Sequence, residues 1–194
     1  VNMTRISMKS AVDASDLTEA EILGRKQVHE TFHFLKKYIP GFENCKLAYS
    51  GPNIGIRESR KINGVYKLTV DDLTNNVMFP DAVTMGGYPI DVHSPDGNNT
   101  VHKFLKPGSW YSIPYRSLVT NEIDNLIVAG RCISATQEAC SSTRLTPIVM
   151  ALGQAAGTAA AQCVATGEKA NALNTDILRA QLKKDGAFLD EYRA

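Results

Sequence analysis

Strong charge of either sign, clustered cysteines and long apolar runs are all missing from this sequence of 194 residues. Lysine and arginine total 21 and aspartate and glutamate total 20, so a net charge of +1 provides no general attraction for nucleic acid or anionic membranes. No uninterrupted apolar run approaches the roughly 20 residues of a transmembrane helix. Apolar residues still make up 43% of the chain, which is typical of a globular protein and not of a disordered one.

The four cysteines are far apart in the sequence, and no Cys-x-x-Cys pair occurs; they are Cys45, Cys132, Cys140 and Cys163. This spacing excludes zinc sites built from paired cysteine ligands. A chain of this length buries roughly 70% of its unfolded surface, so it does not need disulfides for stability. We interpret Cys132 as a packing residue, because no second cysteine follows it at the Cys-x-x-Cys spacing.

One metal-binding pattern is present, because residues 29–33 read His-Glu-Thr-Phe-His and match the zinc-hydrolase pattern His-Glu-x-x-His. That pattern requires both histidines on one polar helix face, but no downstream signature marks a third ligand. The apolar stripe of the predicted helix runs beside the histidines, through Val28, Phe32, Leu35 and Ile39. We therefore favour a helix at the boundary of the protein without a metal, and keep a zinc hydrolase acting through His29, Glu30 and His33 as the less favoured alternative.

Residues 1–44 form the first of three predicted segments, which is helical. Thr18 and Glu21 have the spacing of a capping box and predict a helix from residue 18 to about Tyr38, ended by Pro40-Gly41. The sequence opens with Val1 and not with methionine, so we expect the natural N-terminus, with any targeting segment, to be missing. Localisation therefore stays open, with the cytoplasm as the default.

The second segment, residues 45–110, alternates short extended stretches with turn clusters and predicts an antiparallel sheet. A short helix is expected near residues 69–72. The extended stretches, which run a few residues into the next segment, are 45–49, 54–60, 64–68, 83–92 and 110–119.

The third segment, residues 111–194, has the pattern of a parallel α/β fold. Residues 125–130 form a continuous apolar run ending in Gly130, which is typical of a strand buried on both faces. Thr146-Pro147 then has the N-cap and first-turn pattern of a helix that runs to about residue 166 and ends at Gly167. A second helix over 174–185 is expected to turn Ile177, Leu178 and Leu182 inward.

The strand, glycine and helix of this segment predict a ligand site. Gly130 ends the strand at the carboxyl edge of the expected sheet, where open α/β folds place ligands. The helix that starts near Thr146 has free backbone N–H groups at its positive end, which suit an anion or a developing negative charge. A strand and a tightly packed alanine-rich helix without any ligand remain the alternative interpretation.

Four blocks of sequence, taken in order, resemble the C-terminal half of a family of bacterial FAD-dependent oxidoreductases. That family is distantly similar to the flavoprotein subunits of fumarate reductase and succinate dehydrogenase. The match covers about residues 50–165, and four ordered blocks are more specific than any one of them. The blocks are 54–69 (IGIRESRKI followed by YKLT), 88–93 (YPIDVH), 111–118 (YSIPYRSL) and 125–157 (NLIVAGRCISA through MALGQAAG).

The resemblance implies a mixed α/β fold, in which the C-terminal part of a three-layer, Rossmann-like FAD-binding domain joins an antiparallel sheet region on the substrate side. It implies FAD as cofactor and hydride transfer between flavin and a small molecule that carries a carboxylate. The expected cofactor-binding residues are Gly130, Arg131, Ser134, Thr146, Ile148 and Val149. Arginine forks suit carboxylates, and histidine exchanges protons near neutral pH, so the expected catalytic residues are Arg57, His93, Arg116 and Arg144. Structural ion pairs for the arginines and a packed strand-end histidine are the alternatives.

The family's phosphate-binding turn, Gly-x-Gly-x-x-Gly, is absent from the sequence. We therefore expect the chain to be the C-terminal part of an oxidoreductase, whose partner is the N-terminal half of the same enzyme or a second copy. The alternative, from another functional class, is a non-catalytic assembly module without a complete cofactor site.

Overall fold

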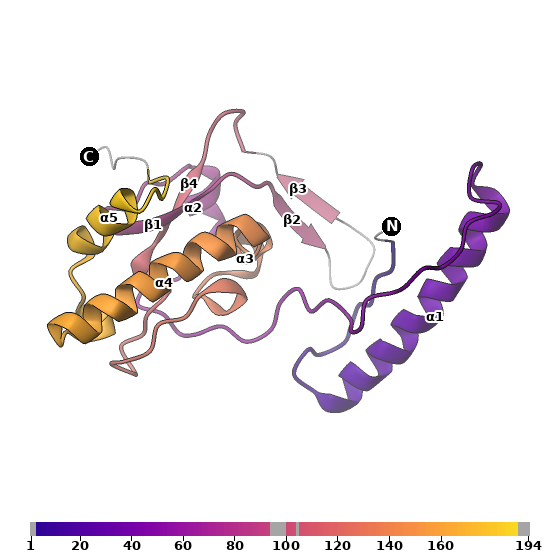
Figure 1. The fold of residues 1–194 in the computed structure, drawn as a ribbon, viewed down its shortest axis with the longest axis horizontal. Helices are drawn as coiled ribbons and strands as arrows, with labels where there is room; N and C mark the ends of the chain where they lie inside the picture. The colour runs from indigo at the N-terminus through magenta and orange to yellow at the C-terminus, as the bar shows by residue number, and fades with distance from the viewer. Residues whose placement is uncertain (1–2, 94–99, 104, 190–194) are drawn as a thin grey trace. The chain divides into compact units, whose positions relative to one another are not determined.

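The computed structural model describes residues 3–93, 100–103 and 105–189 and divides the chain into two compact units (Figure 1). The first unit consists of residues 1–59 with 95–98, and the second of residues 60–94 with 99–194. The boundary falls inside the segment 45–110 that the sequence assigned to one sheet region.

The first unit is built on one long helix, α1 (Ala14–Tyr38). Its N-cap is Asp13, whose side chain accepts a hydrogen bond from the Asp16 N–H, so the predicted capping box at Thr18 was wrong. The Thr18 hydroxyl instead donates to the carbonyl of Ala14 inside the helix, at 2.8 Å. The helix ends at Tyr38, before Pro40, as predicted.

The extended segment after α1 forms no strand, which corrects the strands predicted at 45–49 and 54–60. Side chains of α1 hold this segment by its backbone instead. Arg25 donates to the carbonyl of Pro52 at 2.7 Å, and the Glu21 carboxylate accepts the N–H of Ile54 at 2.7 Å. Bonds from side chains therefore replace the ladder that a sheet would have provided.

The second unit contains two small antiparallel sheets of two strands each. β1 (Ala82–Gly86) pairs with β4 (Tyr111–Pro114), and β2 (Ile90–His93) pairs with β3 (Thr100–Lys103). The short helix expected near residue 69 is α2 (Val70–Thr74), and its Thr69–Asp72 capping box is complete. The structure is thus a mixture of helices and small antiparallel sheets, consistent with the predicted α/β class.

The parallel strand predicted at 125–130 is absent. In the described part of the chain these residues make only one isolated antiparallel bridge, between Ile127 and Val119, and the single parallel bridge joins Leu68 to Ala135. Residues 126–129 are half-buried, so the apolar run fills a boundary and not the centre of a sheet. A continuous apolar run does not distinguish these two cases.

The other helices of the second unit lie on both sides of this run in the chain. They are η1 (Tyr115–Ser117), η2 (Gly130–Cys132), α3 (Gln137–Thr143), α4 (Thr146–Thr166), η3 (Ala170–Ala172) and α5 (Thr175–Lys184). α4 packs against β1 and lies beside α5 (Figure 1). The core includes the buried residues Leu152 and Ala155 of α4 and Leu178 and Leu182 of α5. Ile177, predicted to point inward, is 57% exposed, because it lies on the opposite face of α5 from Leu182.

The sequence predicted how α4 begins, at Thr146-Pro147, and how it ends, at Gly167. Gly167 ends the helix with φ +73°, the left-handed conformation that favours glycine, as predicted. The N-cap, however, is Leu145 and not Thr146, which is the first helical residue. Among the described residues, α4 is also the one helix that is long and apolar enough to cross a membrane by length and composition, a test that core helices of soluble proteins also pass.

Two glycine substitutions should change stability in opposite directions. A Cβ atom at Gly86 would lie 2.5 Å from the ring of Tyr111, which is fully buried, whereas a Cβ atom at Gly153 on α4 would meet nothing within 4 Å. We expect Gly86→Ala to lower the free energy of unfolding by about 1–3 kcal/mol, because the core has no room for the added methyl group. Gly153→Ala should raise it by about 0.5–1 kcal/mol, because alanine favours the helix. Urea denaturation measures both, and equal effects would contradict the packing described.

Candidate functional site

Three segments of the second unit are joined by backbone hydrogen bonds around Ser134. Its N–H donates to the carbonyl of Ser117 at 2.9 Å, and its own carbonyl accepts the N–H of Leu68 at 3.0 Å. The segments approach so closely that a Cβ atom at Gly64 would lie 2.5 Å from Cβ of Ser134. Ser134 is buried at this junction, so its backbone fixes the loop that begins at Gly130.

Gly130 and the first turn of α4 lie in contact. Gly130 has φ +85°, which glycine adopts without strain, and a Cβ atom built there would lie 3.5 Å from the Val149 side chain. The structure therefore brings together two of the six predicted cofactor-binding residues, from segments almost twenty positions apart. It places Thr146 and Ile148 on the same first turn.

The N-terminus of α4 has no side-chain cap. Its N-cap residue, Leu145, makes no capping hydrogen bond from its side chain, and Pro147 has no N–H to donate. The N–H of Val149 is already bonded to the carbonyl of Leu145 at 2.8 Å. The amides of Thr146 and Ile148 are thus the donors at the positive end of this helix, where a negative charge is stabilised.

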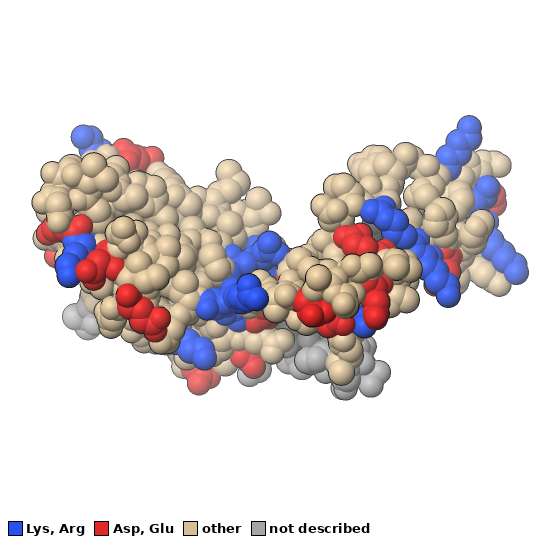
Figure 2. All heavy atoms as spheres, turned by 90° about the horizontal axis from the view of Figure 1, so that it is seen from below, with Lys and Arg blue, Asp and Glu red and all other residues tan. Residues whose placement is uncertain are grey.

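Two of the predicted arginines are neighbours in the chain of residues already described, Arg131 of Gly130 and Arg144 of the N-terminus of α4. Arg131 follows Gly130 in η2 and is exposed. Arg144 is half-buried at the C-terminus of α3, two residues before α4, and its backbone N–H donates to the carbonyl of Cys140. Figure 2 shows that basic and acidic side chains both occur across the face it presents, in keeping with the net charge near zero.

Arg116 forms an ion pair that the sequence did not reveal. Its Nε lies 2.9 Å and its Nη2 lies 3.2 Å from the two carboxylate oxygens of Asp81, which is buried. The hydrogen bond to Asp81 raises the pKa of Arg116. Its guanidinium also lies 5.3 Å from the ring centre of Tyr66. This geometry is that of a structural ion pair, which was the alternative to a catalytic role for Arg116. A role for Arg116 in binding substrate stays a prediction.

Tyr66 extends the same network. Its hydroxyl donates to the Asp72 carboxylate, with both oxygens at 2.9 Å. Burial, followed by the bond to Asp72, raises the pKa of Tyr66 to about 12. The phenol therefore stays protonated at neutral pH and acts as a hydrogen-bond donor there. No local sequence signal pointed to Asp81, because it lies 35 residues from Arg116.

The two remaining catalytic candidates are Arg57 and His93. Arg57 is exposed in the extended segment of the first unit. His93 ends β2, where it pairs with Thr100, and its side chain lies outside the described residues. The roles of both stay predictions.

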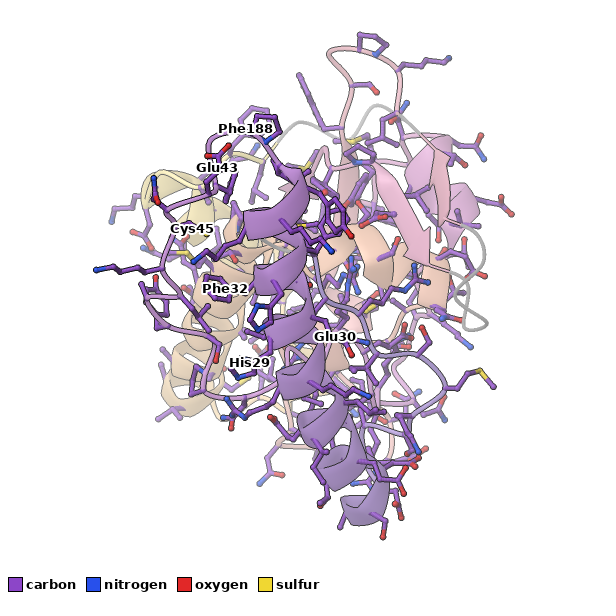
Figure 3. The ribbon with its side chains drawn as sticks, turned by 90° about the vertical axis from the view of Figure 1, so that its right-hand side faces the viewer. His29, Glu30, Phe32, Glu43, Cys45 and Phe188 are labelled. Atoms are coloured by element: carbon purple, nitrogen blue, oxygen red, sulfur yellow. The ribbon has the colours of Figure 1, made fainter. Side chains whose placement is uncertain are left out.

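The His-Glu-x-x-His pattern lies on the surface of α1. His29 and His33 are exposed, and Figure 3 shows His29 and Glu30 pointing away from the helix in different directions. Glu30 is paired with Lys26 at 3.8 Å. Among the side chains that the structure describes, no group of three or more histidine, cysteine, aspartate or glutamate residues is arranged to hold a metal ion.

The Asp81–Arg116 pair should contribute measurably to stability. We expect Asp81→Asn to lower the free energy of unfolding by about 1–3 kcal/mol, because it removes charge-assisted bonds from a buried carboxylate. Asp124→Asn is the matched control, since Asp124 forms a 2.8 Å pair with Lys169 in which both side chains are exposed. Loss of this exposed pair should lower the free energy of unfolding by less than about 1 kcal/mol. Denaturation curves that show no difference between the two variants would contradict the structural role.

Comparison with known proteins gives one match. The family model for FAD dependent oxidoreductases matches residues 1–182, which is nearly the whole chain. No curated protein and no solved structure matches. The family match confirms the family that the order of the sequence blocks predicted. The chain belongs to the FAD-dependent oxidoreductase family, whose cofactor is FAD.

Proposed function

We propose that this chain forms the C-terminal part of an FAD-dependent oxidoreductase and provides the edge of the flavin site. The observation that carries the proposal is the contact between Gly130 and Val149 at the uncapped N-terminus of α4. Membership of the family supports a flavin at this place, since nothing in the helix itself satisfies the first amides.

The residues present fit one edge of a flavin. The donors are the amides of Thr146 and Ile148, which suit the pyrimidine edge, where negative charge develops on reduction. A helix end contributes about 0.3–2 kcal/mol, which corresponds to roughly 6–40 mV for a two-electron couple. The helix therefore favours reduced flavin and tunes the potential, but does not determine it alone.

The residues do not fit the pyrophosphate of FAD, because no Gly-x-Gly-x-x-Gly turn occurs in the sequence. We propose that this turn comes from a partner, either the N-terminal half of the same enzyme or a protein of the same family. Bound FAD supplies the hydride acceptor. The protein's own residues orient the substrate and provide the positive field.

We propose a small carboxylate-bearing molecule as the substrate class. Arg131 follows Gly130 in the chain, and Arg144 lies two residues before α4. Arg131 is exposed to an approaching ligand. Guanidinium groups bind carboxylates with two parallel hydrogen bonds. In this arrangement Arg116 holds the framework through its ion pair with Asp81.

Flavin binding should depend on Gly130. We expect Gly130→Ala to weaken the binding of FAD to the purified chain about fivefold or more, because alanine strains the φ of +85° in the loop beside the first turn of α4. Gly167→Ala is the matched control, because it strains a similar φ of +73° at the other end of the same helix. Titration followed by flavin fluorescence gives both affinities.

The comparison with Gly167→Ala separates local effects on flavin from general strain. Equal losses of affinity in the two variants would contradict the proposed place of the flavin. The proposed function itself fails if the chain binds no FAD alone and none after a family segment that carries the Gly-x-Gly-x-x-Gly turn is added.

Assembly is a second candidate function, favoured by the outer face of α4. The helix has no charged residue over its 21 residues, and Val164 is 87% exposed. Gly153 and Gly157 are open on the same helix. An uncharged exposed helix face of this length favours association with the complementary half or with a second copy.

A charge on this face should reduce association. We expect Val164→Lys to shift the chain towards the monomer, because a lysine in an apolar interface must lose its hydration. Ile177→Lys on α5, which is 57% exposed, is the control and should leave the molecular mass unchanged. Sedimentation velocity across a concentration series measures both variants. A wild-type chain that stays monomeric at every concentration, without and with the complementary half, would contradict the assembly function.

A further inference from the structure

The sulfurs of Cys132 and Cys140 both lie against the same short stretch of backbone, residues 129–131. The Cys132 thiol donates to the carbonyl of Ala129, at 3.2 Å. The Sγ atom of Cys140, on α3, lies 4.0 Å from the carbonyl oxygen of Arg131. One cysteine comes from η2 and the other from the helix packed against it.

The separation of the two cysteines is limited by covalent geometry. The carbonyl oxygen of Arg131 lies across one planar peptide bond from Cα of Cys132, a fixed separation of about 2.8 Å. The Cys140 sulfur is therefore within about 7 Å of Cα of Cys132. A rotation of the Cys132 side chain about its Cα–Cβ bond, away from the Ala129 carbonyl, moves its sulfur without a change of backbone.

The two thiols differ in access. Cys132 is half-buried and is therefore the more accessible of the two thiols. Cys140 is 1% exposed, so an oxidant does not reach it directly. This difference assigns separate roles to them, one as the thiol that is attacked from outside and the other as the thiol that resolves the product.

We propose that Cys132 and Cys140 form a thiol modification site that closes to a disulfide when a low-molecular-weight disulfide is present. The Cys132 thiolate attacks one sulfur of oxidised glutathione, forms a mixed disulfide and releases one glutathione thiolate. The Cys140 thiolate, whose proton passes to that released thiolate, then attacks Sγ of Cys132 and expels the second glutathione thiolate, which takes up the Cys132 proton from solvent. The protein loses two electrons and two protons, and the oxidant becomes two thiols.

The disulfide would tie η2 to α3. Gly130 belongs to η2 and packs on Val149 of α4, so oxidation fixes the loop beside the uncapped end of α4. The chemistry of the two thiols is measured without flavin, and the inference is therefore independent of the proposed function.

The sequence provides a direct assay. Trypsin cleaves after Arg131 and Arg144, so both cysteines remain on one peptide, residues 132–144. The native protein is treated with oxidised glutathione, free thiols are alkylated, and the digest is analysed by mass spectrometry. We expect this peptide without alkyl groups and lighter by two hydrogens, and alkylated at both cysteines once it has been reduced.

Single variants separate the two roles. In Cys140→Ser the glutathione adduct on Cys132 should accumulate, because no resolving thiol remains. In Cys132→Ser the buried Cys140 should stay unmodified. The double variant Cys45→Ser/Cys163→Ser is the control and should give the same oxidised peptide as the wild type, since neither of these cysteines lies in residues 132–144.

Three results would overturn the proposal. The first is a fully alkylated peptide 132–144 from oxidised wild-type protein. The second is the absence of a glutathione adduct on Cys132 in a Cys140→Ser variant that circular dichroism shows to be folded. The third is a disulfide that joins Cys132 to Cys45 or Cys163 in the wild-type protein. The first and third are read from the wild-type chain, so they hold even if a variant does not fold.

Discussion

The backbone of Leu68 is the constraint on which the second unit depends. Its N–H donates to the carbonyl of Ser134 at 3.0 Å, and its carbonyl accepts the N–H of Thr136 at 2.8 Å, while its side chain is fully buried. These two hydrogen bonds hold the irregular segment around Leu68 against residues 134–136, where the described part of the chain has no regular sheet to do so. The loop from Gly130 to Thr136 is consequently fixed at one end, and the contact of Gly130 with α4 fixes it at the other.

In the proposed flavin site, a chain with almost no net charge favours a negative group. The positive potential comes from the peptide dipoles of α4 and from the amides of Thr146 and Ile148, and not from an excess of lysine and arginine. The ion pair between the buried Asp81 and the partly exposed Arg116 is neutral overall and stabilises the framework. Near-neutral composition and local anion binding are therefore compatible.

Local patterns predicted local structure well, because they depend on neighbouring residues. The short helix near residue 69 and the end of α4 at Gly167 followed from residue type and spacing, whereas the N-caps predicted at Thr18 and Thr146 were wrong. The parallel strand at 125–130 was wrong, because an apolar run does not reveal whether a neighbouring strand exists. The partner of Arg116 was missed because Asp81 is distant in the sequence, and only the fold brings the two together.

The central claim is that the flavin edge lies at the first turn of α4. Nuclear magnetic resonance of the 15N-labelled chain, recorded with increasing FAD, tests it most directly. We expect the amide signals of Gly130, Thr146 and Ile148 to shift together with one affinity, while those of α5 stay in place. Shifts confined to other parts of the chain, with these three amides unmoved at saturation, would contradict it.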